Sequence, residues 1–146
     1  MGRLKEEALI MRSRILFLSG HQNDDACLLS HMLRDLPLVL DTAEDLQQAR
    51  AKLLQDEFQV ILTEAALPDA NWLDVLHLVR ECPHEVQVIV TSAHADAALW
   101  AEALNLGVYD VLAQPFYETE VRRILSNACS RQHHWAQPAA RAMATA

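Results

Sequence analysis

The most constraining feature of this sequence is Val60–Thr63, a short and unbroken run of apolar and β-branched residues. The run is too short for a helix and lacks the alternation of a half-solvated strand, so it predicts a strand that is covered on both faces. Such a strand lies in the middle of a parallel sheet. The run ends at a carboxylate, Glu64, and a turn of small residues follows as far as Pro68. Because ligands bind at the carboxyl ends of strands in open α/β sheets, Glu64 is the first candidate for a functional residue.

Four further apolar runs alternate with stretches whose apolar residues recur at helical spacing. The expected strands are residues 14–18, 38–40, 60–63, 86–90 and 108–113. We expect Asn23 and Thr42 to cap the first two helices. Pro83 should end the third helix and Gly107 the fourth. Five strands alternating with five helices predict an α/β fold, a parallel sheet with helices on both faces, which resembles the flavodoxin-like order 2-1-3-4-5.

Length, charge and cysteine content restrict the class of protein. The 146 residues suffice for one domain, which we expect at 14–133, between an N-terminal arm at 1–13 and a C-terminal tail at 134–146. No apolar run approaches the roughly 18 residues of a membrane span. A formal charge of -8 argues against direct nucleic-acid binding. The cysteines show neither disulfide nor zinc-site spacing, which favours a reducing cytoplasm; they are Cys27, Cys82 and Cys129.

Three stretches near the strand ends carry a family resemblance: Val60–Asp69, Val88–His94 and Gly107–Phe116. In that order they resemble the phosphoacceptor strand with its Leu-Pro turn, the fourth strand, and the Gly-Ala-x-x-aromatic-x-x-Lys-Pro-Phe ending of the receiver domain of bacterial two-component response regulators. The resemblance extends from Arg14 to about Cys129 and implies the CheY-like form of the flavodoxin-like fold.

The resemblance is weakest at the positions that carry the family's chemistry. The matching positions are Ser19 and Gly20 for the acidic pair that holds Mg²⁺, Glu64 for the phosphoacceptor aspartate, Ser92 for the switch hydroxyl, Val111 for the switch aromatic residue and Gln114 for the lysine. Only the hydroxyl is retained.

These departures predict that phosphoryl transfer is lost. The reaction depends on a metal ion that bridges phosphate oxygens and on cationic groups that absorb developing charge. Ser19 and Gly20 supply no anion for Mg²⁺, and Gln114 carries no positive charge. Glutamate is also one methylene longer than aspartate, which misplaces its attacking oxygen. We therefore expect no catalytic residue, no metal site and no cofactor.

Glu64 then has three interpretations. It is a partly solvated relic, tied to Ser92 or to a loop N–H, whose removal changes stability little. Alternatively, it mimics the phosphorylated state with less charge than a phosphate. In the third interpretation it belongs to a repurposed small-ligand or metal pocket, with His21 as a candidate ligand. Asp24 and Asp25 are better explained by the helix dipole than as a displaced acidic pair.

The resemblance implies an atypical, phosphorylation-independent receiver domain, a protein-interaction module in bacterial signal transduction or transcription control, and not an enzyme. The expected dimer and output surface lies on the fourth helix, fifth strand and fifth helix. Its candidate residues are Trp100, Glu102, Tyr109, Tyr117, Arg122 and Arg123. The implied partners are a sensor kinase, an output domain, another regulator or a second copy in a homodimer, and the chain would be an adaptor or the first part of a larger regulator.

Two alternatives remain. One is a conventional receiver that accepts a phosphoryl group. The other is a flavodoxin-like binder of FMN or a nucleotide, with residues 19–23 as a phosphate loop at a helix N-terminus. The chain has only three glycines, which argues against such a loop.

Overall fold

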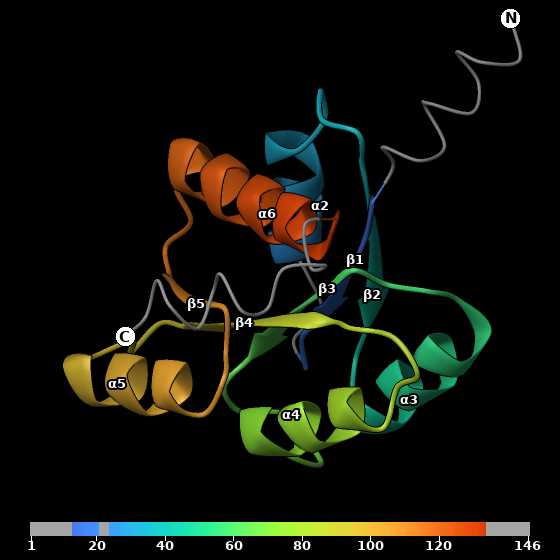
Figure 1. Cartoon of the computed structure of the whole chain (residues 1–146). Coiled ribbons are helices and arrows are strands. Elements are labelled where there is room, and N and C mark those ends of the chain that lie inside the picture. Colours follow the sequence, from blue (N-terminus) through green and yellow to red (C-terminus); the bar gives the residue numbers. More distant parts are fainter. Residues whose placement is uncertain (1–12, 21–23, 134–146) are drawn as a thin grey trace, which may run out of the picture.

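The computed structural model describes residues 13–20 and 24–133 as a five-stranded parallel sheet between two layers of helices (Figure 1). The strands are β1 (Ser13–Leu18), β2 (Leu38–Ala43), β3 (Val60–Glu64), β4 (Gln87–Ser92) and β5 (Asp110–Ala113), in the order β2-β1-β3-β4-β5. The helices are α2 (Asp24–Met32), α3 (Leu46–Gln55), α4 (Trp72–Arg80), α5 (Ala97–Asn105) and α6 (Glu118–His133). The predicted fold class and strand order are confirmed. The expected arm and tail lie outside the described residues, apart from Ser13, which begins β1.

The helices cover the two faces of the sheet unequally. In Figure 1, α2 and α6 lie on one face of the sheet, whereas α3, α4 and α5 lie on the other, with α5 next to the edge strand β5. Alternate strand residues therefore enter two separate cores. Phe17 and Leu62 pack with the α2 and α6 side, whereas Leu18 and Ile61 pack with the α3 and α4 side.

The central strand is as buried as its sequence predicts. All five residues of β3 are buried, because β1 and β4 pair with its two edges and helices cover both of its faces. Gly107 also has the positive φ, 104°, expected of a residue that ends a helix. No helix in the described part of the chain combines the length and apolarity that a membrane crossing requires.

The prediction that Thr42 caps a helix is wrong. Strand β2 runs further than expected, so Thr42 pairs with Phe17 in the β1–β2 ladder. The cap of α3 is Asp45, whose Oδ1 accepts a hydrogen bond of 2.8 Å from the Gln48 N–H. Asn23, the other expected cap, lies outside the described residues.

Candidate functional site

The predicted site residues gather at the carboxyl edge of the sheet. Glu64 ends β3, Ser92 ends β4, and Gln114 directly follows β5. They line one pocket of about 300 Å³, whose walls are formed by Asp25, Glu64, Ala65, Ala66, Thr91, Ser92, Ala93, His94 and Gln114. Glu64 and Thr91 are partners in the β3–β4 register, so both reach the pocket from adjacent strands.

Glu64 is enclosed by the protein. Its exposure is 8%, and its Oε1 accepts a hydrogen bond of 3.1 Å from the backbone N–H of Gly20. A loop N–H is therefore the partner of this carboxylate. Ser92 is not: its Oγ accepts a hydrogen bond of 3.0 Å from the His94 N–H. The expectation of a partly solvated carboxylate is wrong, because β3 is buried through to its last residue.

Gly20 lies against the ring of Pro68, and the contact leaves no room for a side chain. A Cβ atom at position 20 would be 2.6 Å from Pro68 Cδ and 2.8 Å from Pro68 Cγ. The proline ring cannot rotate away as the end of a flexible side chain can. An acidic residue at position 20 is therefore incompatible with the packing of this loop.

The loop that carries Pro68 is itself fixed by hydrogen bonds. The Leu67 N–H donates to the Ala70 carbonyl over 2.9 Å, and the Trp72 N–H donates to the Ala65 carbonyl over 3.1 Å. Trp72 is 7% exposed and packs into the core at the start of α4. These contacts hold the proline in place over the end of β1.

Ser19, the other position of the expected acidic pair, also faces the interior. Its exposure is 2%, and its backbone N–H donates a hydrogen bond of 3.0 Å to the Ala43 carbonyl. Neither Ser19 nor Gly20 lines the pocket. The residues present therefore do not fit the Mg²⁺ site that the resemblance implies, because neither position at the end of β1 offers a carboxylate and Gly20 has no room for one.

On the opposite side of the pocket, Gln114 is part of a hydrogen-bonded chain. Its Nε2 donates to Thr91 Oγ1 over 3.3 Å, and Thr91 Oγ1 donates to the Leu112 carbonyl over 2.6 Å. Since the Thr91 hydroxyl uses its proton on Leu112, it must accept from the amide, which fixes the amide orientation. Sequence reasoning missed Thr91, because a threonine in an apolar strand looks like a β-branched core residue.

Val111 belongs to the core and not to the pocket. It is 1% exposed and packs in the cluster on the α3 and α4 side of the sheet. A valine in this place has no ring that could swing between a buried and an exposed position.

Two acidic residues begin α2, and the structure separates them. Asp24 is exposed, whereas Asp25 is half-buried and lines the pocket. Both lie in the first turn, as the dipole interpretation predicts. His21, the candidate metal ligand, lies outside the described residues. Within the described ranges, no three His, Cys, Asp or Glu side chains gather to hold a metal ion.

The expected interface residues differ in availability. Trp100 is 38% exposed and Tyr117 is 66% exposed, and Glu102 and Arg123 are exposed as well. Tyr109 packs partly against the core. The Arg122 Nη1 donates a hydrogen bond of 2.9 Å to the Met32 carbonyl at the end of α2, so this side chain is engaged within the molecule.

Helix α5 presents an apolar stripe to solvent. Ala103 is its buried residue, and Glu102 is its only charged one. The exposed residues Ala97, Trp100, Ala101 and Leu104 recur at i, i+3, i+4 and i+7. A stripe at this spacing is the pattern by which one helix packs against another.

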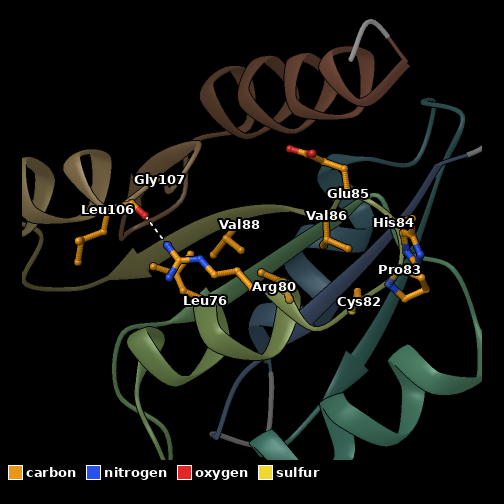
Figure 2. A pocket seen from close by; sticks show the side chains of 11 residues that line it. Leu76, Arg80, Cys82, Pro83, His84, Glu85, Val86, Val88, Leu106 and Gly107 are labelled. Atoms are coloured by element: carbon orange, nitrogen blue, oxygen red, sulfur yellow. Dashed lines mark hydrogen bonds between the residues drawn. The ribbon is translucent and has the colours of Figure 1, made fainter. Parts of the chain in front are cut away.

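A larger cavity, of about 670 Å³, lies away from these residues, between the end of α4 and the turn at Gly107 (Figure 2). The Arg80 side chain extends across the cavity, and its Nη2 donates a hydrogen bond of 3.0 Å to the Leu106 carbonyl. Burial and the nearby Glu81 carboxylate raise the pKa of the Cys82 thiol, which opposes thiolate chemistry there. The cavity lies by the first residues of β4, at the opposite edge of the sheet from Glu64.

Comparison with known proteins gives a consistent picture. A family model described as the response regulator receiver domain matches residues 22–126. The transcriptional regulatory protein KdpE of Staphylococcus aureus (strain NCTC 8325 / PS 47) is 32% identical over 117 residues, which cover 77% of this chain and 48% of that protein. The signal transduction histidine-protein kinase BarA of Escherichia coli (strain K12) is 29% identical over 100 residues, which cover 67% of this chain and 11% of that protein. The chain thus spans less than half of either relative.

A solved structure supports the same fold. The signal receiver domain of an HD domain-containing protein from Pseudomonas fluorescens Pf-5 superposes with a TM-score of 0.74 at 27% identity. The superposition covers 84% of this chain and 98% of that chain.

Proposed function

The chain belongs to the response regulator receiver domain family, and from this premise we propose that it is a phosphorylation-independent receiver, a module that binds other proteins in signal transduction or transcription control. The observation that carries the proposal is the packing at the end of β1. Gly20 uses its N–H to hold Glu64, and Pro68 occupies the space where an acidic side chain would lie. Phosphoryl transfer needs a metal that bridges the phosphate oxygens, and this side of the pocket offers it no ligands.

The proposed signalling context follows from the relatives. KdpE is described as a transcriptional regulatory protein and BarA as a signal transduction histidine-protein kinase. We propose the same broad setting for this chain, in the cytoplasm, with a kinase, an output domain or another regulator as its partner.

We propose that the interaction surface centres on α5 and extends over β5 to the start of α6. The exposed stripe of α5 supplies an apolar centre that includes Trp100 and Leu104, and Tyr117 lies after β5. Tryptophan and tyrosine are enriched among residues that dominate binding energies. Exposed charges at Glu102 and Arg123 suit the polar rim of such a surface. A second copy of the chain, giving a homodimer, is the partner that can be tested directly.

Sedimentation velocity tests both parts of the proposal. We expect self-association that is the same with and without Mg²⁺ and a small phosphodonor. Trp100→Ala should weaken it by about tenfold or more, because truncation of a central aromatic anchor commonly costs that much. Leu54→Ala is the matched control, since Leu54 is also a large exposed apolar residue, 83% exposed, but lies on α3.

Two results would contradict the proposal. A chain that is monomeric at every concentration would remove the homodimer. Self-association that appears only with the phosphodonor would remove independence from phosphorylation.

A further inference from the structure

We propose that Asp41 and Lys52 prevent the outer edge of β2 from pairing with β2 of a second copy of the chain. Both side chains lie at this edge, where they form hydrogen bonds with the backbone of the strand. The inference goes beyond the proposed function, because it concerns a different surface and holds whether or not α5 forms a dimer interface.

The strand β2 is one of the two edge strands of the sheet, so only its β1 side is paired (Figure 1). The Ser13 N–H donates a hydrogen bond of 3.0 Å to the Pro37 carbonyl. At the other end of the ladder, the Ser19 N–H donates to the Ala43 carbonyl over 3.0 Å. Since the backbone groups of successive strand residues point to alternate sides, the odd-numbered residues of β2 face β1. The residues whose backbone groups face outward are Leu38, Leu40 and Thr42.

This edge is suited to pairing with a second copy of itself. Free backbone groups on an edge strand are a template for another strand, and Leu38–Leu40 is a half-buried apolar run. A two-fold axis between two copies would place their β2 strands antiparallel. With Leu40 at the axis, Leu38 of each copy would face Thr42 of the other, so the ladder would need the backbone groups of Thr42.

The side chains of Asp41 and Lys52 already engage both backbone groups of Thr42. The Asp41 Oδ1 accepts a hydrogen bond of 2.8 Å from the Thr42 N–H. The Lys52 Nζ donates to the Thr42 carbonyl over 2.6 Å and to the Asp41 Oδ1 over 2.7 Å. Burial raises the pKa of Asp41, but the hydrogen bonds from Lys52 and from the Thr42 N–H outweigh burial and hold this pKa below its usual value. The pair is therefore charged at neutral pH.

The rest of the edge offers a second copy little. The Leu38 N–H donates a hydrogen bond of 2.7 Å to the Leu36 carbonyl. Leu40 is then the one outward residue of β2 whose N–H and carbonyl both lack a partner in the part of the chain that the structure describes. Very short free edges are one means by which proteins avoid strand addition. The contacts of Thr42 thus decide whether the free edge is long enough to pair.

Sedimentation velocity of Asp41→Ala/Lys52→Ala tests the inference. The double variant frees both backbone groups of Thr42 and leaves the net charge of the chain unchanged. We expect self-association about tenfold tighter than in the parent, because each copy gains interstrand hydrogen bonds. The matched control is Arg50→Ala/Glu81→Ala, which also removes an ion pair of α3, of 3.5 Å, but one made with the end of α4. Its self-association should equal that of the parent.

Two further measurements locate the new contact. Hydrogen exchange at the Leu40 amide should slow as the protein concentration rises in the double variant, and should not change with concentration in the control. Addition of Leu40→Pro removes the N–H at the centre of the edge and should return self-association to the parent level. The increase should also persist when Trp100→Ala is added, since the α5 surface takes no part in it.

Three results would overturn the inference: a folded double variant that associates no more tightly than the parent, an equal increase in the control, or Leu40 exchange that does not depend on concentration. Lys52→Ala alone frees only the Thr42 carbonyl and should give a smaller increase. This single variant decides the question by the same criteria if the double variant does not fold. Because the Trp100→Ala background separates the two surfaces, failure here would leave the proposed α5 interface unaffected.

Discussion

The β1 side of the pocket and its β4–β5 side differ in how much room they leave for another side chain. At the end of β1, Gly20 is in contact with Pro68, and Ser19 is buried and does not line the pocket. Across the pocket, Ser92 and Gln114 are only half-buried and line an open wall. In our proposal, the end of β1 corresponds to the metal-binding side of the family's site and is closed by packing, whereas the β4–β5 wall corresponds to the phosphate-binding side and keeps polar groups. A substitution that introduces an acidic residue at Gly20, at the end of β1, should therefore destabilise the protein rather than restore a metal site.

The largest expected effect is that of Gly20→Asp. Its Cβ would lie within 2.6 Å of the Pro68 ring, so the loop must shift, and overpacking of this kind typically costs about 1–3 kcal/mol. Urea unfolding measures the loss. Ala93→Asp is the matched control, because it places the same acid on the exposed wall of the same pocket and should cost little.

A double variant sharpens this prediction. Replacement of the proline in Gly20→Asp/Pro68→Ala removes the ring atoms that the new side chain meets, so part of the lost stability should return. If Gly20→Asp alone were as stable as the parent, the contact with Pro68 would not exclude side chains, and the two sides of the pocket would not differ.

Glu64→Ala should have the next largest effect. It leaves the Gly20 N–H without its acceptor inside the protein, which costs about 1–3 kcal/mol. Glu64→Gln retains an acceptor and should cost less. Equal melting temperatures for the parent and Glu64→Ala would show that this carboxylate has no structural role, as expected of a solvated relic.

Removal of the Thr91 hydroxyl should cost more stability than removal of the Ser92 hydroxyl, because Thr91 is fully buried and Ser92 is not. Thr91→Val deletes a buried group that donates to Leu112 and accepts from Gln114, for a loss of about 1 kcal/mol. Ser92→Ala removes an acceptor for the N–H of the exposed His94 and should change stability by less than about 0.5 kcal/mol. Thermal unfolding of both variants decides the ranking, and the reverse order would contradict it.

Gln114→Lys should have the smallest effect. The position is half-buried beside Glu64 and Asp25, so a lysine can extend toward two carboxylates, and the change in stability should stay within about 0.5 kcal/mol. A severe loss would show that the β4–β5 wall is as tightly packed as the end of β1.

The fold could be predicted from the sequence because the determining patterns are local. The short apolar run at Val60–Thr63 can only be a covered strand, and its neighbours repeat the alternation of strand and helix. Gly107 is likewise marked by the end of an apolar helical stretch. The prediction for Thr42 is wrong because threonine is common both as a helix cap and in strands, and the pairing of β2 with β1 places it in a strand.

The site could be predicted only in part. The positions that line the pocket followed from the strand ends, whereas the contact between Gly20 and Pro68 joins two loops that meet only once β1 and β3 are paired. No local sequence pattern predicts this contact. The burial of Glu64 was missed for the same reason, since it depends on neighbours from β1 and β4.

Incubation with Mg²⁺ and a small phosphodonor, followed by intact mass measurement and peptide mapping, tests the central claim most directly. The packing of Gly20 against Pro68 predicts an unchanged mass, both for the parent and for Gln114→Lys. A mass gain of one phosphoryl group that maps to Glu64 or to a residue beside it would contradict the account.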